Sequence, residues 1–244
     1  MNERSTTGLI GQSFAIVASI LLAFAIDAWW EDYKEQEEIR SLLEGLVIEI
    51  EGNLRTLETE MLFHRAKSKS AVEILQMMET ELGEVNPLRL DELINDIMWW
   101  SGTDFATGTL DSIVNSGGLK WVEPIELRSQ LSSWKDKLEL FKKYEQQDWD
   151  TYHDKLLPFL ALNSNLAQLG AAADGRPGMT RSYEGVYRQV PDTEMVNHKV
   201  LLQNQEFHSL VIITNWDQGD FEASVPEILE HGRELLRLTK SVVD

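Results

Sequence analysis

Two glutamate–histidine pairs at a spacing of four residues are the side chains in this sequence best placed to do chemistry together. They are Glu60 with His64 and Glu227 with His231. Residues four apart lie on one face of a helix, so each pair could present a carboxylate and an imidazole to one metal ion. Helical di-iron sites need two Glu-x-x-His steps with further glutamates, a pattern that is not found here. We therefore expect no metal and no other cofactor, and we keep a metal-dependent hydrolase as an alternative.

Hydrolytic and nucleotide-dependent chemistry has weaker signals still. The sequence contains no cysteine, no Gly-x-Ser-x-Gly motif, no phosphate-binding glycine loop and no dinucleotide-binding fingerprint. Asp150, His153 and Asp154 could be drawn as a catalytic triad, but an acidic helical sequence offers such combinations by chance. We expect a protein that acts by binding, as a scaffold, an assembly factor or a sensory component, rather than an enzyme.

The segment that must position everything after it is the apolar run at residues 8–30, GLIGQSFAIVASILLAFAIDAWW. As a helix, the part from Leu9 to Trp30 would extend about 33 Å, enough to cross a hydrocarbon core of about 30 Å. Trp29 and Trp30 would then lie among the lipid headgroups, where indole rings are enriched. The run predicts a transmembrane helix in contact with membrane lipid.

A cleaved signal peptide is the alternative interpretation of the same run. Ala23-Phe24-Ala25 has the small-x-small form of a cleavage site. The run is longer than the usual signal-peptide stretch of about 7–15 residues, however, and it is preceded by little positive charge. We expect an uncleaved anchor over residues 1–30 and one acidic helical domain over residues 31–244.

Small residues recur every fourth position within the anchor, at Gly11, Ala15, Ser19 and Ala23. Such a ladder lets two membrane helices approach closely. It predicts self-association into a homo-oligomer, or association with another membrane protein.

Two polar side chains, Gln12 and Asp27, interrupt the apolar run. Asp27 lies close to the two tryptophans, where a carboxylate can reach water at the membrane edge. The alternative is a ring of carboxylates in an oligomer which, together with Gln12, would form part of an ion or solute path.

Charge constrains both orientation and partners. Arg4 precedes the run, and the ten residues after it, EDYKEQEEIR, hold two basic and five acidic side chains. The formal net charge of −19 excludes nucleic acid as a partner, because phosphates would be repelled. We expect a single-pass protein with its N-terminus in the cytoplasm and the rest of the chain outside it.

Apolar residues at helical spacing predict an all-α fold. One stripe follows the anchor without a helix breaker, so the transmembrane helix is expected to continue as a long amphipathic helix to near Leu82. A second stripe follows Pro124. Gly117 and Gly118 predict that the short helix before them ends in a C-terminal cap with left-handed backbone conformation. The members of the two stripes are Ile39, Leu43, Leu46, Ile50, Leu57 and Met61, and then Leu127, Leu131, Trp134, Leu138 and Phe141.

The remaining segments complete a predicted bundle of about six or seven helices. Further helices are expected over residues 90–100, 109–116, 148–169 with an interruption near Pro158, and 194–215, followed by a last helix to about Val242. Asp91 and Glu92 are expected in the first turn of the 90–100 helix, and Pro226 in the first turn of the last one. Residues 170–193 are rich in glycine, proline and small residues, and they predict a loop.

Adjacent tryptophans at positions 99 and 100 are the most distinctive aromatic feature outside the anchor. On a helix Trp99 and Trp100 cannot face the same way, so one of them is a candidate for an exposed contact with a partner protein or a bilayer surface. Trp134 falls on an apolar stripe and is expected in the core.

Two stretches resemble a family of uncharacterised bacterial single-pass membrane proteins. The first, SILLAFAIDAWWEDYKEQEEIRSLLEGL, has Asp27, Trp29 and Glu31 at that family's polar, tryptophan and acidic positions. The second, TLDSIVNSGGLKWVEPIELRSQLSSW, is similar to its short helix, Ser-Gly turn and following Leu-Arg-x-x-Leu step. The resemblance implies an anchored helical domain and brings no known reaction or cofactor. Asp27 departs from the pattern, because an amide is common at that position.

Overall fold

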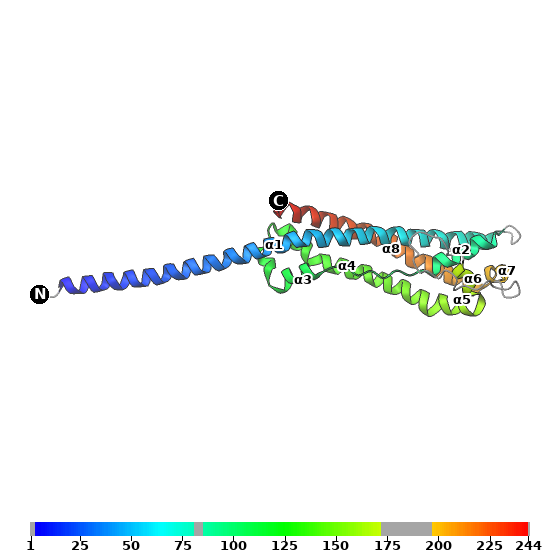
Figure 1. The fold of residues 1–244 in the computed structure, drawn as a ribbon, viewed down its shortest axis with the longest axis horizontal. Coiled ribbons are helices and arrows are strands. Elements are labelled where there is room, and N and C mark those ends of the chain that lie inside the picture. The colour runs from blue at the N-terminus through cyan, green and yellow to red at the C-terminus, as the bar shows by residue number, and fades with distance from the viewer. Residues whose placement is uncertain (1–2, 81–84, 172–196, 244) are drawn as a thin grey trace. The chain divides into compact units, whose positions relative to one another are not determined.

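The computed structural model of the chain describes residues 3–80, 85–171 and 197–243, with side chains described from Ile16 onward and not at residue 171. The regular structure of these residues is entirely helical, as predicted (Figure 1). In chain order the helices are α1 (Glu3–Glu79), α2 (Pro87–Met98), α3 (Gly108–Asn115), the 3-10 turn η1 (Gly118–Trp121), α4 (Ile125–Thr151), the π-helical turn η2 (Tyr152–Leu156), α5 (Leu157–Asn163), α6 (Leu166–Ala171), α7 (His198–Leu202) and α8 (Gln205–Val243).

Helix α1 runs without a break through 77 residues, which confirms that the N-terminal helix continues into the long amphipathic one. Its large apolar side chains between Ile16 and Trp30 are all exposed, by 48% to 67%. Within the described residues, no helix combines the length and the apolar character needed to cross a membrane.

The chain divides into two compact units, and α1, α4 and α8 contribute residues to both. Unit 1 comprises Met1–Ile50, Ala106–Ser132 and Leu235–Asp244. Unit 2 comprises Glu51–Phe105 and Ser133–Glu234.

Unit 1 is built on the first part of the predicted α1 stripe. Ile39, Leu43, Leu46 and Ile50 are buried there, together with leucines and isoleucines of α3, α4 and α8. Gly117 has φ 73°, the left-handed conformation that glycine adopts without strain, and it follows the C-cap of α3, Ser116, as predicted for the end of that helix.

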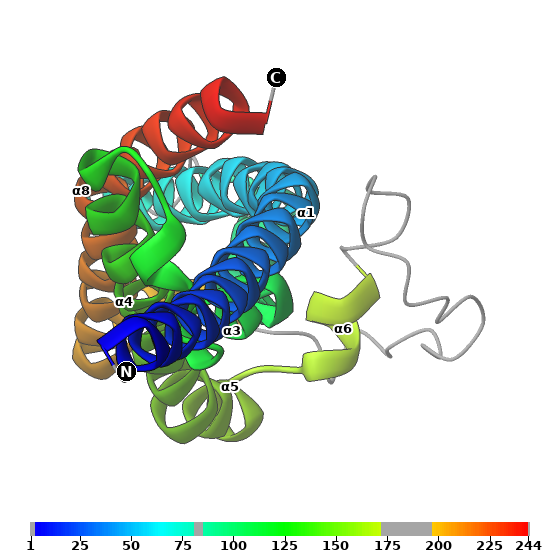
Figure 2. The same cartoon turned by 90° about the vertical axis from the view of Figure 1, so that its left-hand side faces the viewer.

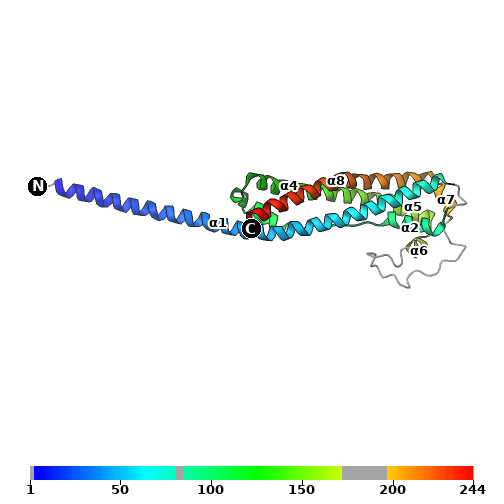
Figure 3. The same ribbon diagram turned by 90° about the horizontal axis from the view of Figure 1, so that it is seen from above.

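Unit 2 packs its parts of α1, α4 and α8 side by side (Figures 1 and 3), and the end-on view shows them around a common interior (Figure 2). The second predicted stripe continues into this interior, where Trp134 and Phe141 are fully buried. Gly232 permits a close approach, because a Cβ atom there would lie 2.7 Å from the Trp134 ring and 2.8 Å from a Leu54 methyl group. A separate apolar cluster joins α1, α2, α5 and the start of α8.

Two predictions at helix N-termini are wrong. Helix α2 begins at Pro87 rather than residue 90, because the Asn86 side chain accepts hydrogen bonds from the backbone N–H groups of Leu88 and Arg89. Asp91 and Glu92 therefore lie beyond its first turn.

Pro226 lies inside α8 rather than at its start. The missing N–H removes one helical hydrogen bond. Buried neighbours on both sides of the proline, Phe221, Val225, Ile228 and Leu229, hold the helix together through packing.

The expected interruption near Pro158 takes the form of the π-helical turn η2, which ends two residues before the proline. Pro158 itself lies in the first turn of α5, which ends at Asn163. Of the predicted 170–193 loop, residues 170 and 171 belong to α6, and residues 172–193 lie outside the described residues.

Candidate functional site

An aromatic cleft of about 410 Å³ in unit 2 is the best candidate for a binding site. Its volume is within the range of about 300–1,000 Å³ that is typical of small-molecule sites. Its walls come from the end of α2, the connection after it, the end of α4 with η2, and helices α5 and α6. The lining residues are Asn95, Met98, Trp99, Trp100, Trp149, Tyr152, His153, Leu157, Leu166 and Gly170. We call these residues the aromatic cleft.

Trp99 and Trp100 reach the cleft because α2 ends before them. The prediction of a helix over residues 90–100 is wrong at this end, since Trp99 is the C-cap of α2 and has extended backbone angles, φ −76° and ψ 141°. The Trp99 indole N–H donates to Asn95 Oδ1 at 2.8 Å. Both tryptophans therefore line one cleft, although adjacent residues of a helix would have faced different ways.

The opposite wall is made where α4 passes into the π-helical turn. The Leu157 N–H bonds to Tyr152 O, five residues back, which is the hydrogen bond that defines this turn. Trp149 stacks on His153 with ring centroids 4.8 Å apart and lies 5.8 Å from Tyr152. The Trp100 ring lies 4.6 Å from Trp149, so the two walls meet through these indoles. Single-turn π-helices inside α-helices are frequent at functional sites.

Behind the cleft lies a fully buried ion pair. Lys67 Nζ donates to both carboxylate oxygens of Asp148, at 2.7 and 2.8 Å, and the two side chains are 1% and 2% exposed. The same ammonium donates to the backbone carbonyl of Trp99 at 2.9 Å. The pair thus joins α1 and α4 and fixes the residue that starts the cleft wall.

The hydrogen bonds continue on both sides of this pair. On the core side, Gln218 Nε2 donates to Asp148 Oδ1 at 2.7 Å, and Gln218 Oε1 lies 2.7 Å from His64 Nδ1. On the cleft side, Asn95 Nδ2 donates to the carbonyl of Leu169 at 3.0 Å. We call the set His64, Gln218, Asp148, Lys67, Trp99 and Asn95 the polar chain.

Burial controls the ionisation of this region. It lowers the pKa of His64 to about 4, against the opposing effect of the bond to Gln218, so the imidazole is neutral at pH 7. Burial also lowers the pKa of Lys67, with Asp148 acting in the opposite direction, and it raises the pKa of Asp217, against hydrogen bonds from Thr151 and Gln147. His64 stacks on Phe221 with ring centroids 3.4 Å apart, which fixes its orientation.

A pair of carboxyl groups lies elsewhere in the same unit. Glu145 accepts from the Thr103 backbone N–H at 3.0 Å and from the Thr103 hydroxyl at 2.7 Å. Burial raises the pKa of Glu145 to about 7 against these bonds, and the nearby Glu60 raises it further. The pKa of Glu60 is itself raised by burial.

The structure does not bring together the residues that predicted metal or hydrolytic chemistry. His64 bonds to Gln218, whereas a hydrogen bond from Ser101 acts on Glu60. Glu227 pairs with Lys137, and His231 stacks on Trp134. No group of three or more histidine, aspartate or glutamate side chains in the described part of the chain could hold a metal ion.

The triad drawn on paper does not assemble either. His153 Nδ1 lies 2.9 Å from Asp154, and Asp150 accepts from Gln146. The described residues that line the cleft offer mainly aromatic surface.

The described residues of the predicted anchor lie in unit 1 and do not line the cleft. Asp27, Ser19, Ala23, Trp29 and Trp30 are exposed on α1 in unit 1. Gly11, Gln12 and Ala15 belong to the same helix, and their side chains lie outside the described residues.

Sequence analysis missed Trp149, Tyr152, Lys67 and Asp148. Trp149, Tyr152 and His153 stand three and four residues apart, a spacing that could have marked one aromatic face. Lys67 continues the α1 stripe, three residues after His64 and four before the buried Ala71, so its position already indicated burial.

Comparison with family models, with curated proteins and with solved structures finds no match for this chain. The class of the protein therefore rests on the fold and the site. It is an all-α protein with a ligand-sized aromatic cleft linked to a buried polar chain.

Proposed function

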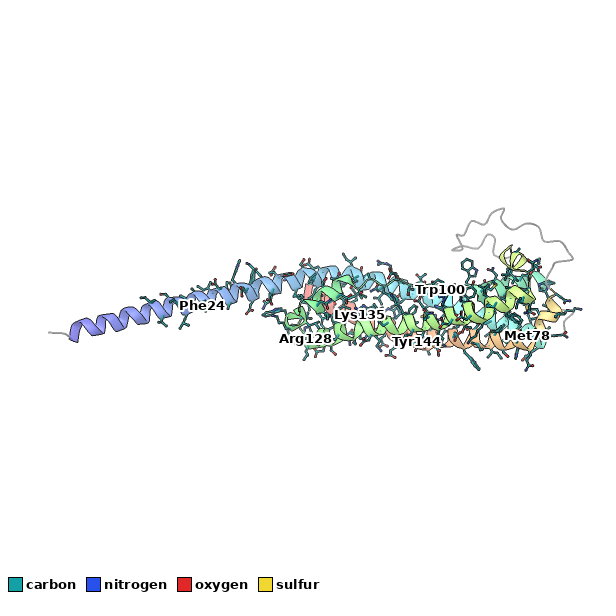
Figure 4. All side chains as sticks on the ribbon, turned by 90° about the horizontal axis from the view of Figure 1, so that it is seen from below. Phe24, Met78, Trp100, Arg128, Lys135 and Tyr144 are labelled. Carbon is teal, nitrogen blue, oxygen red and sulfur yellow. The ribbon has the colours of Figure 1, made fainter. Side chains whose placement is uncertain are left out.

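We propose that this chain is a membrane-anchored helical protein that acts by binding rather than by catalysis. The observation that carries the proposal is the exposed apolar stretch of α1. From Ile16 to Trp30 every large apolar side chain is 48% to 67% exposed, and no charged residue occurs between Arg4 and Asp27. Phe24, labelled in Figure 4, is the most exposed of them. Contiguous apolar surface of this kind needs a cover, and lipid tails supply one along a whole helix.

The proposal includes a location and an orientation. The protein would lie in a bacterial inner membrane, with the N-terminus in the cytoplasm and residues 31–244 in the periplasm. Arg4 before the run, and a sequence without cysteine, which suits an oxidising compartment, support this orientation. The aromatic cleft would provide the ligand-binding surface of the anchored domain.

Self-association along α1 is the second part of the proposal. Ser19 and Ala23 are the members of the small-residue ladder whose side chains are described, and both are exposed on the helix. A small side chain at these positions would let a second copy of the helix approach closely.

Vesicle flotation of the full chain tests the anchor. We expect the wild type to float with phosphatidylethanolamine–phosphatidylglycerol vesicles and to resist extraction with alkaline carbonate, whereas Leu21→Arg with Phe24→Arg should stay unbound. Leu62→Arg is the matched control, because Leu62 is as exposed as Phe24, at 67%, and lies on α1 outside the stretch. Extraction of the wild type by carbonate, or flotation of the double variant, would contradict the proposal.

The same preparations test association in the membrane plane. In a maltoside detergent, Ser19→Leu should lower the particle mass of the full chain, and Val17→Leu, off the ladder, should not. Equal masses for all three chains would remove the self-association part and leave the anchor standing.

A further inference from the structure

We propose that the aromatic cleft binds a small organic cation with a quaternary ammonium group. This inference rests on the proposed binding role of the cleft and is independent of the membrane anchor. Quaternary ammonium groups are recognised by several aromatic ring faces that converge on one site, through attraction to the electrons of the rings. Trp100, Trp149 and Tyr152 line this cleft, with the Trp149 ring centroid 4.6 Å from that of Trp100 and 5.8 Å from that of Tyr152. Trp100, labelled in Figure 4, is 40% exposed.

The polar groups of the cleft favour a ligand that needs few hydrogen bonds. The Asn95 amide is already used on both sides, since Oδ1 accepts from Trp99 and Nδ2 donates to the Leu169 carbonyl. The Trp99 carbonyl is taken by Lys67. A primary ammonium needs acceptors for three N–H groups, and the oxygens of Asn95 and Trp99 are already in use, whereas a quaternary ammonium needs none.

Charge favours a cation over an anion. No lysine or arginine occurs among the described residues that line the cleft, so an anion would lack a charged partner. The ammonium behind the wall, Lys67, is neutralised by Asp148 at 2.7 Å. Asp150 and Asp154 are exposed next to the lining residues Trp149 and His153, with one exposed cation, Lys155, beside Asp154, and the net charge of the chain is −19. This field attracts cations toward the cleft.

The position of Trp100 depends on the absence of a side chain at Gly102. A Cβ atom there would lie 2.7 Å from the far edge of the Trp100 ring, so alanine at this position would push the indole aside. Gly102→Ala should therefore displace the Trp100 ring without removing it from the cleft.

Calorimetric titration of the full chain in a maltoside detergent tests the inference, with choline and its neutral isostere 3,3-dimethyl-1-butanol as probes. Detergents with a phosphocholine headgroup would compete and are avoided. We expect choline to bind about tenfold more tightly than the isostere, or about 1.4 kcal/mol, which lies between the strengths of an exposed and a desolvated cation–π contact. Monomeric dihexanoyl phosphatidylcholine forms a second arm, and whichever trimethylammonium compound binds more tightly identifies a free cation or a lipid headgroup as its source.

Variants connect the binding to the cleft. Trp100→Ala and Gly102→Ala should each weaken choline binding at least about fivefold, and Trp100→Phe should restore part of it. Trp216→Ala is the matched control, because Trp216 is also exposed, at 67%, and lies outside the cleft on α8. If choline and the isostere bind equally well and Trp100→Ala abolishes both, the inference of a cationic ligand is overturned and the cleft is an apolar binding site. Absence of binding by every probe would overturn the inference without affecting the vesicle test of the anchor.

Discussion

Unit 1 and unit 2 differ in what they bury. Among the described residues of unit 1, the buried side chains are apolar except for Thr239, whose hydroxyl donates to the Leu235 carbonyl in its own helix. The other buried polar side chains, including Lys67 and Asp148, belong to unit 2. The ion pair of Glu35 with Lys120 in unit 1 lies at the surface. One unit is thus built as an ordinary apolar core, and the other contains a connected polar interior.

The difference is informative because buried ion pairs are a poor way to gain stability. Apolar residues of similar volume often replace such a pair at no cost, or with a gain of about 1–4 kcal/mol. The polar chain of unit 2 is therefore better explained by what it positions. Lys67 bonds to the Trp99 carbonyl and Asn95 bonds to the Trp99 indole, so the chain fixes a cleft residue from both its backbone and its side chain.

The largest expected effect is the loss of one member of the buried pair. Lys67→Met leaves the Asp148 carboxylate buried without its cation, and we expect it to lower the free energy of unfolding by about 3–5 kcal/mol. Urea denaturation followed by circular dichroism measures the change. Lys67→Met combined with Asp148→Leu removes both charges and should recover most of the loss.

The matching pair in unit 1 provides the control. Lys120 and Glu35 are 62% and 51% exposed, so Lys120→Ala should barely change the free energy of unfolding. If Lys67→Met lowered the free energy of unfolding no more than Lys120→Ala does, the buried pair of unit 2 would not differ in strength from the exposed pair of unit 1.

A smaller effect is expected from pH. Burial raises the pKa of Glu145 to about 7 in the folded chain, above its usual value of 4.5. Between these values the folded state holds a proton that the unfolded state has released, so the free energy of unfolding falls as the pH rises through 7. His64 has the opposite effect, because its pKa is lowered from 6.5 to about 4. Its contribution makes the free energy of unfolding rise with pH, mainly below pH 6.5.

The useful window for Glu145 is therefore pH 6.5 to 8. Across it we expect a loss on the order of 1 kcal/mol in the free energy of unfolding, and Glu145→Gln should flatten the profile. Unfolding in urea at several pH values provides the measurement. A wild-type profile that rises with pH in this window would contradict the assignment.

Local pattern predicted much of the helical frame and little of the polar interior. The stripes of α1 and α4 and the glycine at position 117 follow from spacing and backbone conformation, which neighbouring residues determine. Lys67 and Asp148 are 81 positions apart, and their pairing depends on how two helices align. The spacing that puts Lys67 on the buried stripe was visible, but the identity of its partner was not.

Helix ends show the same division. Asn86 caps α2 through its own side chain, a signal present in the sequence that the later acidic residues obscured. Pro226 inside α8 depends on packing against other helices, which outweighs local preference. Trp99 and Trp100 were chosen from the sequence as contact residues, but their shared cleft required the end of α2, the π-helical turn and α6 to meet in space.

The smallest expected effect tests a part-buried polar contact of unit 1. Glu49 Oε2 accepts from the Thr109 N–H at 2.7 Å, and Oε1 accepts from the Leu110 N–H at 3.2 Å, at the N-terminus of α3. Glu49→Gln keeps one acceptor oxygen but removes the charge that interacts with the helix dipole. We therefore expect a loss of about 0.5 kcal/mol and faster amide hydrogen exchange at these two positions. Glu44→Gln, at an exposed position of α1, is the control and should leave the exchange unchanged. A loss as large as that of Lys67→Met would mean that unit 1 also depends on a charged contact, and the contrast with unit 2 would fail.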